Sequence, residues 1–476
     1  MDVSQTPQGV HELITERLFP KTFRKQVEKI LPLTRPVISL ELTDPNCNPH
    51  RGYTRRLSGA ELEAVKRAIA EMLEQGIIRP CKSDWNSSLL IPRKNEPDNP
   101  RVVLDHRGLN MALRGDVQGL PLIDELIDDA TRENRVFSAI DYRQGFYQLG
   151  LAPESQYLTA FKALGGTWCF TRLSMGLSVA AQSFQRWVQD LFADEIFGKT
   201  ERTPDGPVTS KPILFQYLDD GLIATPCVES HWRALRTIMT RLAENAVCLK
   251  ASKCHFFKSS VVYLGHRISH GKRQMDESKV EILKNMKLPG SKSHLRTMLG
   301  MASFYRGYVP GYANLVMPLE EQIKNHAPQA LTWPPLQLAA FEKLKTALVT
   351  ATALHTFDPA LPIVLDTDAS DYAFGALLHN EVTDPNGTKS LRPCLMFSSK
   401  FDSTQRRWTT TRKEQHGIRA AVQHFHYALH GAKYPVRVRT DHMAATYLFT
   451  KKLQFPTDEE RRVIEALAPY PLNCLA

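Results

Sequence analysis

Two adjacent carboxylates inside an apolar, β-forming run constrain this chain more than any other feature of its sequence. In ILFQYLDDGLIAT, apolar residues stand on both sides of Asp219 and Asp220. Carboxylates buried in an apolar strand are costly, because each charge loses its hydration. A β-hairpin that exposes both of them at its tip explains the pattern. The alternative is an ordinary turn on Asp220-Gly221, because Asp-Gly is a common pair of hairpin turn residues.

A second apolar run also ends at a carboxylate. VFSAID ends at Asp141 and is followed closely by a glycine and two aromatic residues. Two-metal nucleotidyl transfer needs a few carboxylates that hold two divalent ions close together. Asp141 and Asp219 would supply this clamp with support from Asp220, and Mg²⁺ suits their hard oxygen ligands. The two runs together predict a magnesium-dependent site for phosphoryl or nucleotidyl transfer.

The remaining pattern predicts an α+β protein of several domains, as a length of 476 residues also suggests. Strand-like runs alternate with amphipathic stretches over 136–270, a mainly helical part covers 276–350, and a second α/β block begins at LPIVLDTDAS. Nearer the N-terminus, Ser58 and Glu61 form a capping box in front of an apolar helical stripe. The polar stretch 198–212 predicts an exposed loop.

The charge of the chain favours a polyanionic partner. Lys and Arg number 60 against 50 Asp and Glu, which gives a net charge of +10 and a field that attracts nucleic acid. A solvated surface would explain the same excess. The eight cysteines form no CxxC pair, so we expect them to be reduced. No signal-like segment and no long apolar run occurs, so we expect an intracellular protein with no membrane partner.

Five motifs resemble those of reverse transcriptases from gypsy-type (Metaviridae) LTR retrotransposons, and they lie in the same order. They are DHRGLN at 105–110, FSAIDYRQGFYQLGL at 137–151, FKALGGTWCFTRLSMGLSVAAQSFQR at 161–186, QYLDDGLIAT at 216–225 and KCHFFKSSVVYLGHRIS at 253–269. The resemblance implies the reverse transcriptase and ribonuclease H of a Pol polyprotein. The implied fold is a right-hand polymerase with fingers, palm and thumb, a helical connection and an α/β ribonuclease H-like domain.

The resemblance also implies a division of the chain. It comprises an N-terminal extension over 1–50, fingers and palm over 51–270, thumb and connection helices over 271–355, and a ribonuclease H-like domain over 356–476. The last of these would be truncated at its C-terminus.

Around the polymerase site, the resemblance assigns roles residue by residue. Asp141, Asp219 and Asp220 match the metal ligands. Phe146 matches the aromatic gate that excludes a ribose 2′-hydroxyl. Core packing is the alternative role for Phe146, and the neighbouring Tyr147 competes for the gate.

Four further residues match substrate-binding positions. Lys94 and Arg101 match the fingers residues that grip the incoming triphosphate, and a solvated basic loop is the alternative. Met175 and Gly176 match the segment beneath the incoming nucleotide and the template base. This segment departs from the usual Pro-Phe-Gly-Leu, because Ser174 stands in place of the proline.

Two more positions concern the primer and the leaving group. Leu264 and Gly265 match the primer-grip hairpin, which positions the attacking hydroxyl. Lys250 or Lys253 could protonate the pyrophosphate, and a solvated lysine explains either residue equally well.

The second α/β block contains a second set of candidate metal ligands. Asp366 and Asp368 stand two apart on an expected strand and therefore face the same side as a carboxylate pair. The resemblance singles out Asp368 and adds Glu414 and Asp441 as ribonuclease H metal ligands. Thr411 followed by Glu414 also fits a capping box, which alone would explain the glutamate.

The implied activity is RNA- and DNA-directed DNA synthesis, with ribonuclease H degradation of RNA in RNA/DNA hybrids. Each site would hold two Mg²⁺ ions, with Mn²⁺ as a substitute. The implied partners are RNA/DNA hybrid, DNA template-primer, dNTPs and, as an option, a second copy of the chain in a homodimer. The implied location is cytoplasmic virus-like particles, with later nuclear access.

Two alternatives to this enzyme remain. The family usually has a fourth ribonuclease H carboxylate, and the chain reaches Ala476 without a matching segment. A domesticated or structural nucleic-acid-binding subunit with impaired ribonuclease H is therefore one alternative. The equivalent enzyme of a pararetrovirus is the other.

Overall fold

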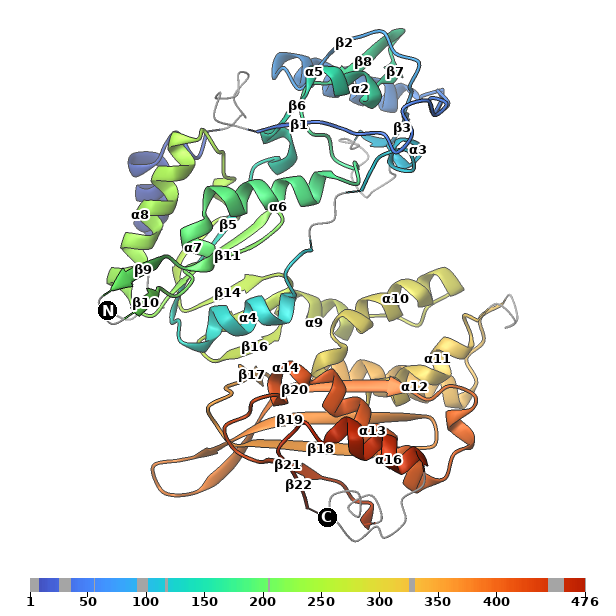
Figure 1. Ribbon diagram of the computed structural model, residues 1–476. Helices are drawn as coiled ribbons and strands as arrows, with labels where there is room; N and C mark the ends of the chain where they lie inside the picture. Colours follow the sequence, from blue (N-terminus) through green and yellow to red (C-terminus); the bar gives the residue numbers. More distant parts are fainter. Residues whose placement is uncertain are drawn as a thin grey trace. The chain divides into compact units, whose positions relative to one another are not determined.

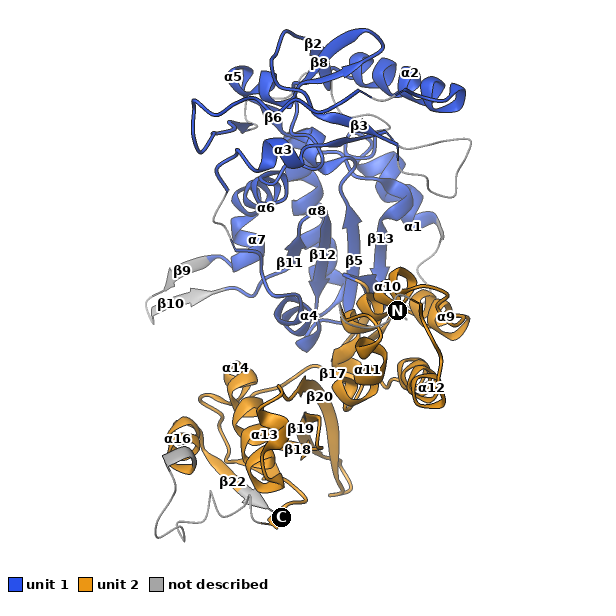
Figure 2. Ribbon diagram, turned by 90° about the vertical axis from the view of Figure 1, so that its right-hand side faces the viewer, with its two compact units in different colours: residues 1–264 blue, residues 265–476 orange. Residues whose placement is uncertain are grey.

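The protein folds into two compact units, residues 1–264 and residues 265–476 (Figure 2). The computed structural model describes residues 8–24, 36–54, 56–91, 102–115, 119–203, 206–324, 330–443 and 458–475. Helices and sheets are mixed in both units, as the sequence pattern predicts. The four parts predicted from the sequence divide the chain more finely than these two units, and that division stays a prediction.

The main sheet of unit 1 carries the first pair of carboxylate motifs. Its strand order is β11-β12-β5-β13, with antiparallel pairing throughout. Strand β5 lies between β12 and β13, which explains why VFSAI is apolar at nearly every position. Helices α4, α6 and α8 pack on this sheet (Figure 2). The bounds are β5 Val136–Asp141, β11 Leu214–Tyr217, β12 Asp220–Thr225, β13 His255–Lys258, α4 Ile123–Arg132, α6 Ala180–Leu191 and α8 Val228–Glu244.

A smaller part of unit 1 has its own apolar core. There, Ser58 accepts a hydrogen bond from the Glu61 backbone and donates its own backbone N–H to the Glu61 carboxylate, so the predicted capping box is confirmed. Two small sheets have the strand orders β2-β8-β7 and β3-β4 (Figure 1). The bounds are α2 Gly59–Glu74, β2 Ile78–Pro80, β3 Ser88–Leu90, β4 Val103–Asp105, β7 Phe161–Ala163 and β8 Gly166–Phe170.

The prediction of a loop over 198–212 is wrong in part. Residues Thr200–Thr203 (β9) pair antiparallel with Gly206–Thr209 (β10). Threonine and valine favour strands, and this local preference outweighs the lack of an apolar period. The other elements of unit 1 are α1 Gln8–Glu12, β1 Val37–Ile38, α3 Arg107–Asn110, β6 Gly150–Leu151, α5 Pro153–Gln156, α7 Ala193–Phe197 and β14 Ser260–Tyr263, with short 3-10 or π turns at Leu13–Leu18, Gly145–Gln148, Tyr157–Thr159 and Ala251–Lys253.

Unit 2 begins with short strands and a set of helices, which confirms the mainly helical prediction for 276–350. These helices share an apolar core that includes Leu295, Val316 and Phe341. The bounds are β15 His266–Ser269, β16 Lys272–Met275, α9 Glu277–Lys284, α10 Lys292–Phe304, α11 Tyr312–Glu321, α12 Pro335–Val349 and β17 Leu354–His355.

The rest of unit 2 is a sheet of five strands in the order β20-β19-β18-β21-β22. Strand β18 is antiparallel to β19 and parallel to β21, and helix α13 packs on β18 and β19 (Figure 1). No helix in the described part of the chain is both long and apolar enough to cross a membrane. The bounds are β18 Ile363–Ala369, β19 Ala373–Thr383, β20 Lys389–Lys400, α13 Thr410–His424, α14 His426–Leu429, β21 Val436–Arg439, α16 Asp458–Leu467 and β22 Leu472–Leu475, with 3-10 turns at Arg306–Tyr308 and Gln405–Arg407.

Candidate active sites

The three candidate polymerase carboxylates come together at one end of the main sheet. Asp141 is the last residue of β5, and Asp220, the first residue of β12, lies directly opposite it. Because Tyr217 pairs with Asp220, the two turn residues of the hairpin are Leu218 and Asp219. The expectation that Asp219 and Asp220 both stand at the tip is therefore corrected by one residue. The alternative turn on Asp220-Gly221 is wrong, because both residues are paired within the strand.

The Leu218-Asp219 turn has a strained backbone. Leu218 has a φ of 50°, a left-handed value that hairpin turns normally give to glycine. Such a residue costs of order 1–3 kcal/mol and needs support from its surroundings. The Leu218 N–H donates to Gln185 Oε1 at 2.7 Å, and Gln216 Nε2 donates to the Leu218 carbonyl. Neither glutamine is among the residues predicted from the sequence, although each stands inside a motif.

A glycine makes room for the Asp219 carboxylate. A Cβ at Gly145 would lie 2.5 Å from Asp219 Oδ1 and 3.1 Å from the Phe184 ring. Asp219 Oδ1 is buried and has no hydrogen-bond partner within the described part of the chain. A buried anionic oxygen without a donor is costly unless a cation faces it. Together with two neighbouring carboxylates, this donor set fits a divalent cation that prefers oxygen ligands.

Burial and mutual repulsion raise the pKa values of these carboxyl groups. Burial, with Asp220 and Asp141 nearby, raises the pKa of Asp219 to about 6. Burial and Asp141 also raise the pKa of Asp220. Lys253 opposes both shifts, and its Nζ lies 2.7 Å from Asp141 Oδ2. The alternative residue, Lys250, meets Asp141 only by donating its backbone N–H to the Asp141 carbonyl. Of the two lysines, Lys253 is therefore the one whose charge reaches the site.

The two aromatic residues after Gly145 point to different parts of unit 1. The Phe146 ring meets Phe184 edge to face at 5.9 Å, and Phe184 also contacts the space beside Gly145. Tyr147 instead stacks on Phe170 at 6.0 Å, and burial raises its pKa to about 12. The geometry favours Phe146 over Tyr147 as the residue beside the carboxylates.

The segment that contains Met175 and Gly176 is held by two residues of DHRGLN. Gly176 has a φ of 90°, and its carbonyl accepts a hydrogen bond from Asn110 Nδ2 at 2.8 Å. His106 Nε2 lies 3.0 Å from the hydroxyl of Ser174, the residue that departs from the family pattern. Burial lowers the pKa of His106 to about 4, so the ring is neutral at pH 7. Met175, in the middle of this segment, remains 48% exposed.

Of the four other predicted substrate-binding residues, the structure describes Leu264 and Gly265. Lys94 and Arg101 lie outside the described residues. Leu264 and Gly265 both have positive φ, at 49° and 79°. Within unit 2, the Tyr305 hydroxyl donates to the Gly265 carbonyl at 2.9 Å, and a Cβ at Gly265 would lie 3.1 Å from the Phe304 ring.

A second cluster forms in unit 2. Asp368 of β18, Glu414 of α13 and Asp441 after β21 each place a ligand oxygen within 4.8 Å of the other two. Among the described residues no other trio of such side chains is as tight, so the polymerase carboxylates are spread more widely. Burial, with Asp441 and Asp368 nearby, raises the pKa of Glu414 to about 7. Glu414 Oε2 is buried without a hydrogen-bond partner, which fits a divalent cation here as well.

Two expectations about this cluster are wrong. The N-cap of α13 is Thr409, which accepts from the Arg412 N–H, so Thr411 and Glu414 do not form a capping box. Asp366 is not part of a metal-facing pair with Asp368. Both of its oxygens accept from Arg439 at 2.5 Å, because β21 lies beside β18 and places Arg439 opposite Asp366.

Comparison with protein families identifies two domains in this chain. The family described as reverse transcriptase (RNA-dependent DNA polymerase) matches residues 91–268, and the RNase H-like domain found in reverse transcriptase matches residues 333–438. This chain carries a reverse transcriptase domain and an RNase H-like domain. The resemblance drawn from the motifs is thereby confirmed.

The chain is also similar to polyproteins of retrotransposons. It is 29% identical to the Retrovirus-related Pol polyprotein from transposon 412 of Drosophila melanogaster, over 91% of this chain and 34% of the relative. It is 26% identical to the Transposon Tf2-3 polyprotein of Schizosaccharomyces pombe, over 85% of this chain and 28% of the relative. The chain thus spans about a third of the length of these curated relatives.

Solved structures confirm the fold class. The foamy viral protease-reverse transcriptase in complex with dsDNA matches with a TM-score of 0.77 at 20% identity, over 99% of this chain and 94% of that one. The same protein in complex with RNA/DNA hybrid matches with a TM-score of 0.76 at 19% identity, over 99% of this chain and 61% of that one. The multidomain polymerase fold with an RNase H-like domain is therefore as predicted.

Proposed function

We propose that this chain is an RNA- and DNA-directed DNA polymerase that extends a primer with dNTPs, and that its RNase H-like domain hydrolyses RNA in RNA/DNA hybrids during retroelement replication. The observation that carries the proposal is the convergence of Asp141, Asp219 and Asp220 around a buried, unpaired Asp219 oxygen. A purely structural subunit would have no need for repelling carboxylates beside that oxygen.

Asp141, Asp219 and Asp220 would hold two Mg²⁺ ions, with Mn²⁺ as a substitute. When bound, such ions activate the primer 3′-hydroxyl and stabilise the charge on the leaving pyrophosphate. Lys253, whose ammonium lies 2.7 Å from Asp141, is the residue that can supply a proton to that pyrophosphate. Phe146, packed on Phe184, would exclude a ribose 2′-hydroxyl.

Around these carboxylates, other residues would bind and orient the substrates. Met175 and Gly176 would support the incoming nucleotide and the template base, because Asn110 and His106 hold their segment rigidly. Leu264 and Gly265 would place the primer terminus. The proposed partners are RNA/DNA hybrid, DNA template-primer and dNTPs, and the net charge of +10 supports nucleic-acid binding. A homodimer is a further option that sedimentation would test.

In the RNase H-like domain, Asp368, Glu414 and Asp441 would hold the ions that activate water against an RNA phosphodiester. The tight spacing of their oxygens supports this role. Both solved neighbours were studied with nucleic acid, one with RNA/DNA hybrid and one with dsDNA, which supports the same class of partner for this chain.

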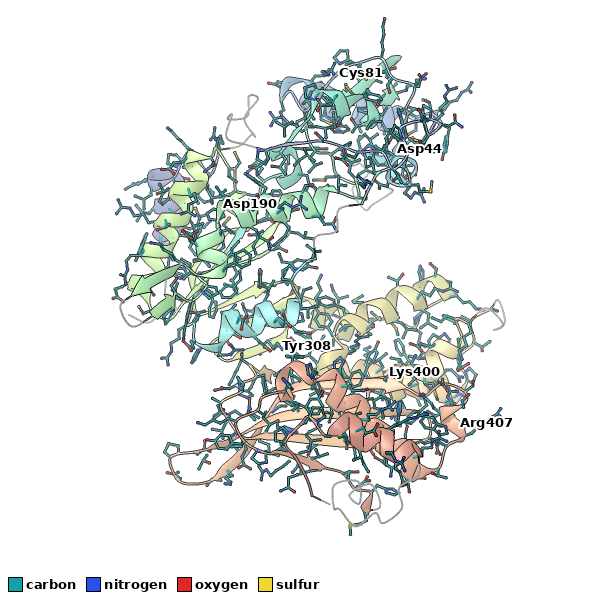
Figure 3. All side chains as sticks on the ribbon, viewed as in Figure 1. Asp44, Cys81, Asp190, Tyr308, Lys400 and Arg407 are labelled. Carbon is teal, nitrogen blue, oxygen red and sulfur yellow. The ribbon has the colours of Figure 1, made fainter. Side chains whose placement is uncertain are left out.

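Primer extension on an end-labelled RNA template tests both activities together. Asp219→Asn should abolish extension and leave RNA cleavage intact, whereas Asp368→Asn should do the reverse. Asp190→Asn is the matched control, because Asp190 is an exposed carboxylate on α6 (Figure 3). Full extension by the Asp219→Asn variant would overturn the polymerase assignment.

A further inference from the structure

The Leu218-Asp219 turn is held by buried amide side chains rather than by contacts of the Asp219 carboxylate itself. Asp219 Oδ1 has no hydrogen-bond partner within the described part of the chain, so the position of the carboxylate depends on the backbone that carries it. That backbone has the left-handed φ of Leu218. Whatever fixes the turn therefore also fixes the carboxylate.

Three polar backbone atoms of the turn have hydrogen-bond partners in unit 1. The Leu218 N–H donates to Gln185 Oε1 at 2.7 Å, and the Leu218 carbonyl accepts from Gln216 Nε2. The Asp219 carbonyl accepts from the Tyr142 N–H at 3.4 Å. Gln185 comes from α6, which packs on β11 in both views (Figures 1 and 2). The turn is thus tied to a helix distant in sequence.

The two glutamines are themselves held in a single orientation. Gln185 and Gln216 are each only 1% exposed. Gln185 Nε2 donates to the Gln216 carbonyl at 3.2 Å, while the Tyr142 hydroxyl donates to Gln216 Oε1 at 3.2 Å. A flipped amide would place N–H against N–H or oxygen against oxygen, so this network determines both amide orientations.

Space for this network comes from the glycine after the two aspartates. A Cβ at Gly221 would lie 2.9 Å from Gln216 Oε1 and 2.7 Å from Ile140. Any larger residue at Gly221 would therefore force the Ile140 side chain, the Gln216 amide or both to move. Gly221 is not a turn residue. Its lack of a side chain instead leaves room for this hydrogen-bond network.

We propose that Gln185 and Gln216 are positioning residues for nucleotidyl transfer, which hold the Leu218-Asp219 turn so that the Asp219 carboxylate faces the metal ion. The inference rests on the proposed function. A buried hydrogen-bond network that is fully satisfied makes its members rigid, whereas the loss of one member leaves buried donors or acceptors unpaired. The two glutamines would act through Asp219, without touching the substrate.

The test compares Gln185→Met, which keeps the side-chain length and removes both hydrogen bonds, with Gln185→Glu, which keeps the acceptor for the Leu218 N–H. In Gln185→Met, we expect the half-saturating Mg²⁺ concentration for primer extension to rise about tenfold, with a smaller rise in Gln185→Glu. The KM for dNTP at saturating Mg²⁺ should change less. Gln189→Met, one turn further along α6, is the matched control and should behave as wild type.

A second readout needs no enzymatic activity. Fe²⁺ with ascorbate and peroxide, used in place of Mg²⁺, should cut the wild-type backbone near residues 217–220, and cutting there should fall in Gln185→Met. Unchanged Mg²⁺ dependence together with unchanged cutting would overturn the inference, even if the melting temperature fell. If Gln185→Met does not fold, Tyr142→Phe replaces it in the test, because this substitution removes only the hydroxyl that holds Gln216. An unaltered Mg²⁺ dependence of Tyr142→Phe would then overturn the inference.

These readouts separate the inference from the proposed function. A wild-type protein that extends no primer, but is cut by Fe²⁺ at this turn in a Gln185-dependent way, would contradict the proposed function and support the positioning role of the glutamines. A wild-type protein that extends primers, with a metal dependence that does not change in Gln185→Met, would support the proposed function and contradict the positioning role.

Discussion

Asp141 and Asp220 lie directly opposite each other on the antiparallel pair of strands β5 and β12. Like charges in facing positions of a sheet destabilise it. Asp219, in the adjoining turn, adds a third carboxylate, and its pKa is raised to about 6. Lys253 offsets part of this repulsion from the side of Asp141. The arrangement is costly for the fold, and a bound divalent cation would relieve the cost.

The first prediction is therefore that Asp219→Asn stabilises the protein when divalent ions are removed. The raised pKa means that the folded state holds the Asp219 proton more tightly than the unfolded chain does. Ionisation of Asp219 thus costs stability as pH rises from about 4 to about 6, and the full cost persists above that range. After solvent screening, we expect a gain of about 1–2 kcal/mol at pH 7 in EDTA and almost none at pH 4.

Denaturant unfolding of both proteins at the two pH values measures this difference. Millimolar Mg²⁺ should stabilise the wild type and have less effect on the variant, because binding to the folded state alone raises its stability. A wild type that is more stable than the variant in EDTA at pH 7 would contradict the prediction.

The second prediction concerns the glycine beside Asp219. In Gly145→Ala, the new methyl group would lie 2.5 Å from Asp219 Oδ1, so the carboxylate or the strand must shift. We expect primer extension to fall by about a hundredfold or more, because a displacement of a catalytic group by about 1 Å can slow a reaction this much. Circular dichroism should show a retained fold. Gly119→Ala is the control, because nothing lies within 4 Å of its Cβ position.

The third prediction separates Phe146 from Tyr147. Phe146 packs on Phe184 beside the carboxylates, whereas Tyr147 stacks on Phe170 in the small core. In Phe146→Val, incorporation of ribonucleotides relative to deoxyribonucleotides should rise about tenfold or more, which corresponds to about 1.4 kcal/mol. Tyr147→Phe should leave this ratio unchanged. Single-nucleotide addition with each type of triphosphate gives the ratio, and the reverse pattern would assign the gate to Tyr147.

The fourth prediction concerns the pH dependence of RNA cleavage. Glu414 must lose its proton to bind a cation, and its pKa in the metal-free site is raised to about 7. At limiting Mg²⁺, cleavage should therefore rise with pH up to about 7 and level off above it, whereas saturating Mg²⁺ should move the rise to lower pH. Cleavage of a labelled RNA strand in a hybrid measures both profiles. Profiles that do not respond to the Mg²⁺ concentration would contradict the role of Glu414.

Local patterns in the sequence were enough to predict many of the elements and most of the candidate ligands. The Ser58–Glu61 capping box depends on residues three apart, and it is present. Apolar runs that end in carboxylates predicted a strand that ends at Asp141 and a hairpin with Asp219 at its tip, although Asp220 lies in the second strand and not in the turn. These features follow from helix and strand periodicity over a few residues, which the chain carries wherever it folds. The specific roles came from the resemblance to known reverse transcriptases.

Only the tertiary structure decided which side chains meet. Strand periodicity places Asp366 and Asp368 on one side of β18, but the neighbouring β21 gives Asp366 an arginine partner and leaves Asp368 for the cluster. In the same way, the packing of α6 on β11 brings Gln185 to Leu218. Contacts of this kind depend on strand order and helix packing between distant segments, and no local spacing specifies them. The sequence by itself thus determined the carboxylates and their elements, while the fold determined which of them share a site.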